Sequence, residues 1–390
     1  MLESGCANRQ SLPLSQSAGD AGKPAESRRW SCMSRRHCLF FVLAFGTLLF
    51  LYNARNPDMS SNRSSSWLSH YNTVKWRIPY KRPGPSAAVS SSVTTTVSQN
   101  KSEPQTLAPY KSPGPYLVEY PYEYHFTINE PYKCEQQKPF LVLVVPVAPH
   151  NRAHRNIIRS TWGGESLDQD KVVQLFFLLG RQSGEGAEQL QEQLLQESKE
   201  HRDLIQSDFL DCYKNLTIKT MVMLEWLDAH CSATSYAMKI DSDMFLNVPK
   251  LISMLLNAPK TNYLTGLVAK GGVVLRDPKS KWYLPASIYP YPQYPRYALG
   301  LGYVFSLDLA KKLVGASRHV KAVYIEDVYL GLCMKHLNIP PTDPPKWGYF
   351  QVFPVRYSRC EYSQLIATTT DAGLDRVWVW NDFKKPGKYC

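Results

Sequence analysis

The chain has 390 residues, 44% of them hydrophobic, and a formal net charge of +12 at pH 7. This length and apolar content suffice for at least one full-sized core, which excludes a wholly disordered chain. A net positive charge is compatible with binding to a nucleic acid, an anionic membrane or a phosphorylated ligand. Lysine and arginine are spread along the whole chain, however, and no dense basic run is interleaved with aromatic residues, so we expect no nucleic-acid partner.

A charge-free apolar segment, CLFFVLAFGTLLFLY, follows a basic stretch near the N-terminus. Its length corresponds to about 22 Å of helix, which suits the thinner bilayers of the early secretory pathway. We expect residues 38–53 to form a transmembrane signal anchor, with residues 1–37 cytoplasmic and the remainder luminal. The alternative is a cleaved signal peptide; the long basic flank and the lack of a clear A-x-A site after Tyr52 favour the retained anchor.

Residues 54–115 are rich in Ser, Thr, Pro and Asn, a composition that buries little and predicts a glycosylated stem. Sequons for N-glycosylation occur at Asn62, Asn100 and Asn215, although such triplets often arise by chance.

Six of the nine cysteines lie beyond Pro131: Cys134, Cys212, Cys231, Cys333, Cys360 and Cys390. None belongs to a CxxC pair, which disfavours a zinc site and favours disulfide bonds in an oxidising lumen. The sequence does not choose among the possible pairings.

Residues 116–390 have the pattern of one globular domain. Near-continuous apolar runs predict buried parallel strands at 140–148, 171–180 and 235–240. Helical patterns occur at 155–162, 186–200 and 216–230. This alternation predicts a doubly wound α/β domain with a mostly parallel sheet.

Two carboxylates, Asp241 and Asp243, flank Ser242 at the end of the predicted strand 235–240. Ligands of open α/β sheets bind beyond the carboxyl ends of strands. Alternate carboxylates can approach one divalent cation and leave room for the oxygens of a diphosphate. The triplet is therefore a candidate metal-bridged nucleotide site; the alternative is a solvated turn, because D-x-D triplets are frequent.

A second acidic pair, Glu326 and Asp327, opens the predicted helix 323–337. The helix dipole ordinarily accounts for acids in a first turn. Partly buried in a cleft, one of them could instead act as a general base.

Cationic and aromatic residues gather after the first predicted strand, at Arg152, Arg155, Arg159 and Trp162. Arg155 and Arg159 are four residues apart, so they share one helix face. That face either carries surface salt bridges or binds an anionic diphosphate.

The segment 280–306 alternates aromatic residues and prolines, among them Trp282, before Gly300 and Gly302. Aromatic faces stack on sugar rings, but the same side chains could simply pack the loop. The glycines permit close backbone approach.

Six stretches stand out in chain order: RNIIRSTWG, DFLDCYKNLTIKT, YAMKIDSDMFLN, KSKWYLP, GYVFS and IEDVYLG. In the same order, they resemble stretches of the β-1,3-galactosyltransferase family of Golgi enzymes, which is glycosyltransferase family 31, and the resemblance is greatest to its type 1 and type 2 members. The resemblance covers roughly residues 130–365 and implies a GT-A fold, a Rossmann-like nucleotide-sugar transferase domain in the Golgi lumen.

The resemblance implies inverting transfer of galactose from UDP-galactose to the 3-hydroxyl of an acceptor sugar, of the N-acetylglucosamine or galactose type, on glycoproteins or glycolipids. It implies Mn²⁺ as the cofactor, with Asp243 the more direct ligand and Asp241 beside it, and Asp327 as the base. The nucleotide-sugar site implied comprises Arg155, Arg159, Trp162, Asp241, Ser242, Asp243, Trp282, Gly302 and Glu326. We also expect association with further copies or with other transferases.

Two departures from the family pattern keep other functions open. Gln351, Val352 and Phe353 stand where relatives often carry Asn-His-Trp, and residues 371–390 do not match the pattern. The alternatives are a β-1,3-N-acetylglucosaminyltransferase on the same scaffold and a sugar-binding relative without turnover.

Overall fold

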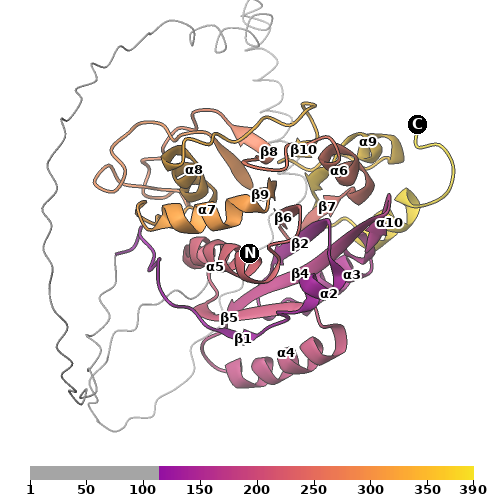
Figure 1. The fold of residues 1–390 in the computed structure, drawn as a ribbon, viewed down its shortest axis with the longest axis horizontal. Coiled ribbons are helices and arrows are strands. Elements are labelled where there is room, and N and C mark those ends of the chain that lie inside the picture. Colours follow the sequence, from indigo (N-terminus) through magenta and orange to yellow (C-terminus); the bar gives the residue numbers. More distant parts are fainter. Residues whose placement is uncertain (1–113) are drawn as a thin grey trace, which may run out of the picture. The chain divides into compact units, whose positions relative to one another are not determined.

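The computed structural model describes residues 114–390 (Figure 1). The predicted cytoplasmic tail, the anchor at 38–53, the sequons at Asn62 and Asn100, and nearly all of the stem lie outside the described residues. Within the described part of the chain, no helix combines the length and apolar character that a membrane span needs.

A large mixed sheet organises the domain, with strand order β1-β5-β4-β2-β6-β9-β8 and β3 paired to β4 (Figure 1). Its strands are β1 (Phe126–Ile128), β2 (Leu141–Pro146), β3 (Leu167–Asp168), β4 (Lys171–Arg181), β5 (Leu204–Leu210), β6 (Tyr236–Ile240), β8 (Leu264–Ala269) and β9 (Tyr297–Ser306). Strands β5, β4, β2 and β6 are parallel, whereas β1, β8 and β9 are antiparallel to their neighbours.

The predicted apolar runs are confirmed as strands β2, β4 and β6. The prediction of a mostly parallel sheet holds only for the central strands. Parallel neighbours need a crossover element, and the connection 270–296 between β8 and β9 contains no helix. That connection instead returns the chain antiparallel, so β9 has the opposite sense to the central strands, as have β1 and β3.

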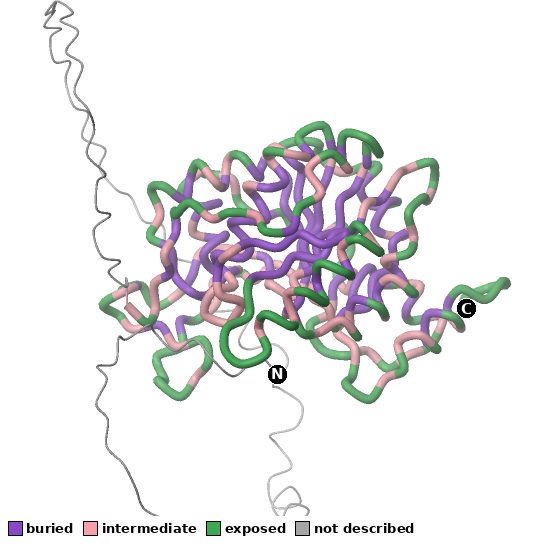
Figure 2. Tube along the Cα trace, turned by 90° about the horizontal axis from the view of Figure 1, so that it is seen from below, coloured by how far each residue is buried: buried purple, intermediate pink, exposed green. Residues whose placement is uncertain are grey.

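Helices cover both faces of the sheet. They are α2 (Lys133–Gln137), α3 (Arg152–Arg159), α4 (Ala187–His201), α5 (Leu216–His230), α6 (Val248–Leu255), α7 (Asp308–Ser317), α8 (Glu326–His336), α9 (Arg359–Gln364) and α10 (Arg376–Phe383), with 3-10 turns η2 (Trp162–Gly164) and η3 (Tyr213–Asn215). The predicted helices 186–200 and 216–230 are confirmed as α4 and α5. Figure 2 shows the buried strands enclosed by partly exposed helices and loops.

The alternation of side chains along β2 divides the core into two clusters, because successive strand residues point to opposite faces. Val142 and Val144 pack with buried residues of α5, α7 and α8. Leu141 and Leu143 pack with buried residues of α3, α4, α6 and α10. The central strand is therefore covered on both sides, as its continuous apolar run predicts.

A second, three-stranded sheet has the order β10-β11-β7 and comprises β7 (Met244–Leu246), β10 (Phe350–Gln351) and β11 (Ala367–Thr369). Disulfide bonds join Cys134 to Cys231 and Cys360 to Cys390, which bears out the expectation of disulfides. The second bond ties the C-terminal residue to α9. The C-terminal part of the chain is thereby fixed beside β7, the strand that directly follows the Asp241–Asp243 triplet.

Candidate active site

The triplet Asp241-Ser242-Asp243 forms a turn at the carboxyl end of β6. The backbone N–H of Asp241 donates to the carbonyl of Leu301 at 3.0 Å, which prolongs the pairing of β6 with β9. The turn lies where ligands of α/β sheets bind, as the sequence predicts. We call residues 241–243 the acidic turn.

Asp241 is held from inside the domain by Lys239. The buried ammonium of Lys239 donates to Asp241 Oδ1 at 2.6 Å and to the carbonyl of Gly300, and it lies 4.0 Å from Glu326 Oε2. Burial raises the pKa of Asp241 to about 6, while Lys239 opposes the rise and Asp243 adds to it. Sequence analysis missed Lys239, although a lysine within the apolar strand YAMKI is the signal that could have identified it.

Asp243 is the exposed residue of the acidic turn, whereas Asp241 is of intermediate burial and is paired with Lys239. Its carbonyl accepts hydrogen bonds from the backbone N–H of Thr370 at 3.0 Å and from the hydroxyl of Thr370 at 2.6 Å. Within residues 114–390 its carboxylate makes no hydrogen bond or ion pair. The backbone is thus fixed while the carboxylate stays free for a ligand.

Ser242 is held from two sides by residues that sequence analysis did not assign to the site. Its hydroxyl lies 3.2 Å from Nδ1 of His154 on α3, and its carbonyl accepts a 2.6 Å hydrogen bond from Arg376 on α10. Burial lowers the pKa of His154; Arg376 lowers it further, and Asp243 opposes the change. Ser242 therefore positions the acidic turn.

Asp327 lies in the first turn of α8 and faces β9. Its Oδ2 accepts from the backbone N–H of Gly300 at 3.1 Å, and its Oδ1 accepts from that of Val328 at 2.8 Å. Burial raises the pKa of Asp327, whereas these backbone N–H groups and Lys239 lower it less strongly. The carboxylate is oriented, partly accessible and more basic than an ordinary aspartate.

The close backbone approach predicted for the glycine pair belongs to Gly300 rather than to Gly302. A Cβ atom at Gly300 would lie 2.8 Å from Glu326 Oε2, closer than such atoms approach in proteins. At Gly302 it would meet Met238 at 3.4 Å, which is an ordinary contact. Gly302 sits within β9 opposite Ile240, and its contact with a nucleotide sugar stays a prediction.

Glu326 is buried and engaged. Its Oε1 accepts from the hydroxyl of Tyr303 at 2.6 Å and from that of Thr220 at 3.1 Å. Burial raises the pKa of Glu326, and Lys239 opposes the rise. Its Oε2 lies 4.0 Å from Lys239 Nζ, so Glu326 supports that lysine, and its contact with a nucleotide sugar stays a prediction.

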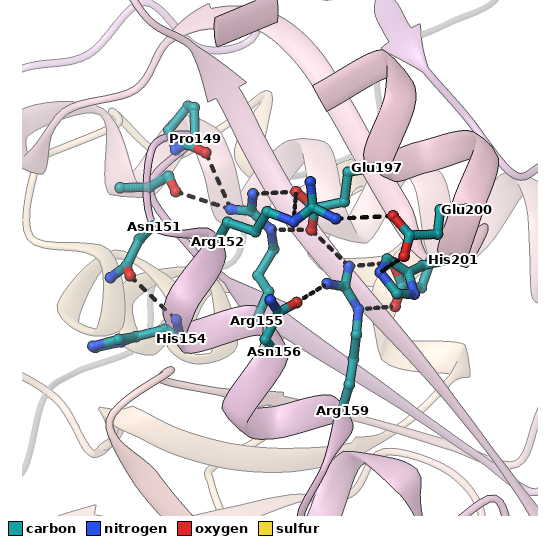
Figure 3. A network of polar contacts seen from close by, with 12 residues as sticks. Pro149, Asn151, Arg152, His154, Arg155, Asn156, Arg159, Glu197, Glu200 and His201 are labelled. Atoms are coloured by element: carbon teal, nitrogen blue, oxygen red, sulfur yellow. Dashed lines mark hydrogen bonds and ion pairs between the residues drawn. The ribbon is translucent and has the colours of Figure 1, made fainter. Parts of the chain in front are cut away.

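Arg155 and Arg159 also lie elsewhere than the diphosphate role requires. Figure 3 shows both guanidinium groups turned toward Glu197 on α4. Arg155 donates to Glu197 Oε1 and Oε2 at 2.7 and 2.6 Å and to the carbonyls of Ala148 and Pro149.

Arg159 binds Asp203 with two nitrogens, at 2.8 Å each, and Glu197 at 2.8 Å. Arg155 is only 1% exposed, as is Glu197. Burial by itself raises the pKa of Glu197, but the bonds from both arginines outweigh that effect and hold the pKa below its usual range. The two arginines form a buried salt-bridge network behind α3, with no donor group facing the acidic turn.

The two tryptophans predicted to bind the nucleotide sugar differ in their positions. Trp162 is buried, and its indole N–H donates to the carbonyl of Met244 at 3.0 Å, so it supports β7 from behind. Trp282 is 47% exposed, with Lys281 Nζ 4.4 Å from its ring centroid. Burial raises the pKa of Tyr213, and the charge of Asp327 raises it further.

The predicted sequon at Asn215 lies at the start of α5, and its glycosylation stays a prediction. Its Nδ2 donates to the carbonyl of Leu210 at 2.9 Å. The hydroxyl of Thr217, which the sequon requires, is buried and donates to the carbonyl of Val323 at 2.8 Å. Both side chains are engaged in these hydrogen bonds at the start of α5.

The site brings together an exposed carboxylate and an oriented, partly buried one. Asp241 in the acidic turn and Asp327 on α8 lie on either side of the link that Lys239 makes to Gly300. No group of three or more His, Cys, Asp or Glu side chains among residues 114–390 is arranged to hold a metal ion. A divalent cation would therefore depend on the carboxylates of the acidic turn and on oxygens of a second ligand.

Comparison with known proteins identifies the family. The galactosyltransferase family model matches residues 153–345, and a model of the β-1,3-galactosyltransferase 2 N-terminus matches residues 55–142. The chain is 38% identical over 265 residues to mouse β-1,3-galactosyltransferase 1, covering 67% of this chain and 79% of that one. The chain belongs to the β-1,3-galactosyltransferase family.

This membership confirms the resemblance found in the sequence. The human β-1,3-galactosyltransferase 2 is 40% identical over 271 residues, which is 68% of this chain and 64% of that relative's length. Among solved structures, the apo form of the bifunctional glycosyltransferase WbbM gives a TM-score of 0.37 and 13% identity, covering 66% of this chain and 50% of that one.

The part of the chain beyond the matched galactosyltransferase range contributes directly to the site. Thr370 and Arg376 hold the acidic turn, and both follow residue 345, where the family match ends. Val352 and Phe353, which depart from the family pattern, are exposed at the end of β10, and the carbonyl of Val352 accepts from Thr369 at 3.0 Å. This family member therefore completes its acidic turn with C-terminal residues.

Proposed function

We propose that the protein transfers galactose from UDP-galactose, with inversion, in β-1,3 linkage to an acceptor sugar of the N-acetylglucosamine or galactose type on glycoproteins or glycolipids. The names of its relatives support galactosyl transfer. One observation carries the chemistry: Asp241, two residues before Asp243, is joined to Asp327 through Lys239 and Gly300, which brings the acidic turn and Asp327 to the same edge of the sheet.

We propose Mn²⁺ as the cofactor. Asp243 would hold the ion through its free carboxylate, with Asp241 beside it, because both offer the oxygen ligands that such a cation accepts. Lys239 already offsets part of the charge of Asp241, which makes Asp243 the stronger ligand. When bound, the ion neutralises the negative charge that develops on the departing diphosphate.

Asp327 would accept the proton of the acceptor hydroxyl. A single displacement needs a base on the face of the sugar opposite the leaving group. Burial raises the pKa of Asp327 toward the working pH, which improves a general base. The N–H groups of Gly300 and Val328 hold its carboxylate in one orientation. Glu326 is excluded from this role because its Oε1 is engaged and its side chain is buried.

We further propose that residues 116–390 form a GT-A type domain in the Golgi lumen, behind a single-pass type II anchor at residues 38–53. The disulfides Cys134–Cys231 and Cys360–Cys390 support an oxidising compartment. Trp282, with its exposed ring, is a proposed contact of the nucleotide sugar.

A donor assay tests the proposal. The purified full-length protein is offered UDP-galactose or UDP-N-acetylglucosamine, with Mn²⁺ and a panel of acceptor glycans, and the linkage of the product is determined. We expect β-1,3-linked galactose; transfer of N-acetylglucosamine alone would refute the donor assignment.

The role of the base is tested separately with Asp327→Asn. We expect this variant to bind UDP as the wild type does and to lose about 10²-fold or more of its transfer rate. Glu188→Gln, which changes an exposed first-turn acid of α4, is the control and should leave the rate unchanged. Full transfer by Asp327→Asn would remove Asp327 as the base.

A further inference from the structure

The chain beyond residue 369 closes over the acidic turn from the C-terminal side. We call residues 370–390 the C-terminal clamp. Thr370 binds the carbonyl of Asp243, and Arg376 binds the carbonyl of Ser242 at 2.6 Å. Asp375 caps α10 by accepting from the N–H groups of Val377 and Trp378, which fixes the turn from which Arg376 extends.

The clamp is anchored well enough to hold a side chain in one place. Trp380 and Phe383 are buried, with their ring centroids 6.0 and 5.3 Å from that of Phe245 on β7. The disulfide Cys360–Cys390 ties the end of the clamp to α9. Arg376 is thus positioned by a rigid support rather than by a free tail.

Arg376 is a cation whose charge no carboxylate satisfies within residues 114–390. Its side chain is half-buried, and its one hydrogen bond there goes to a neutral carbonyl. A guanidinium carries five N–H donors in a planar fork, so most of its donors are not used. Burial lowers the pKa of Arg376, and the charge of Asp243 opposes the change, which places the guanidinium within electrostatic reach of the free carboxylate.

We propose that Arg376 binds the diphosphate of the nucleotide sugar while it holds the acidic turn. Planar guanidinium groups bind phosphate oxygens in a bidentate manner, and the diphosphate must lie close to Asp243 if that residue holds its metal. The inference rests on the proposed function and adds a residue outside the matched family range. It also gives the C-terminal clamp a role in binding the donor.

Three variants separate charge from positioning. Arg376→Gln removes the charge and leaves a neutral N–H donor on a shorter side chain. Arg376→Lys keeps the positive charge and loses the planar guanidinium that can bind phosphate with two nitrogens. Arg359→Ala is the matched control, because Arg359 lies in α9 beside the clamp and donates to the carbonyl of Lys385 instead of the acidic turn.

Calorimetry of the full-length protein with Mn²⁺ measures the affinity for UDP and for uridine. We expect Arg376→Gln to weaken UDP binding at least tenfold and uridine binding less than twofold, Arg376→Lys to recover part of the loss, and Arg359→Ala to bind both normally.

Unchanged UDP affinity in Arg376→Gln would overturn the inference and leave the proposed function standing. Equal losses for UDP and uridine, or an equal loss of UDP affinity in Arg359→Ala, would also overturn it, because a purely structural role predicts both. A wild-type protein that binds no UDP would overturn the proposed function together with the inference.

Discussion

Replacing Arg155 by methionine distinguishes a structural arginine from one that binds the donor. The substitution removes a two-nitrogen salt bridge to Glu197 and the hydrogen bonds to the carbonyls of Ala148 and Pro149. Glu197 would keep Arg159 as a partner, but it would lose Arg155, its buried and nearer cation.

The structure sets the expected magnitude. Arg155 and Glu197 are each 1% exposed, so solvent screening does not reduce the effect. Removing one partner of a buried ion pair costs about 3–5 kcal/mol of unfolding free energy. For a domain of this size, each kcal/mol lowers Tm by about 2–4 °C, which gives a loss of roughly 6–20 °C.

Thermal unfolding of the full-length variant, followed by circular dichroism, measures the loss, and UDP affinity is measured at a temperature where the variant remains folded. Arg152→Met is the control: Arg152 is 43% exposed and contacts the same Glu197 at 3.8 Å, so it should cost less than about 1 kcal/mol. If Arg155→Met kept its Tm but lost UDP affinity tenfold, the assignment of Arg155 to the salt-bridge network would be refuted.

Three further outcomes follow from the site and the core. Asp243→Ala should abolish the Mn²⁺-dependent part of UDP binding in calorimetry, and an unchanged Mn²⁺ dependence would reject Asp243 as a ligand. Gly300→Ala should reduce the transfer rate at least tenfold, because its Cβ would lie 2.8 Å from Glu326 Oε2. The control Gly315→Ala places its Cβ in open space and should keep the wild-type rate. Equal transfer rates for the two variants would contradict the close approach at Gly300. Burial raises the pKa of Glu225, so its ionisation costs the folded state stability as the pH rises through that pKa. Glu225→Gln should therefore raise Tm at pH 7.5, and this gain in Tm should vanish near about pH 4. A gain in Tm that does not change with pH would contradict the raised pKa of Glu225.

Local pattern was sufficient to locate the acidic turn and the acids of α8. The apolar run SYAMKI predicts a buried strand, and whatever follows a parallel strand lies at the ligand-binding edge of the sheet. The order of the motifs identified the family. These features depend on neighbouring residues in the chain, so sequence periodicity is enough to find them.

The partner of each charged side chain was decided by the tertiary structure. The sequence predicted that Arg155 could bind a diphosphate, because its helix follows a strand. In the structure Arg155 instead forms a salt bridge with Glu197, 42 residues further along the chain. Gly300, 61 residues from Lys239, brings that lysine and Asp327 together, and Arg376 reaches Ser242 across 134 residues.

Such pairings depend on which strands become neighbours and on where the C-terminal segment returns. A buried ionic group takes the nearest opposite charge or hydrogen-bonding group that the fold supplies, because leaving it unpaired is costly. The sequence alone therefore determined which residue types gather at the strand end, and the fold decided which of them remain free to meet a ligand.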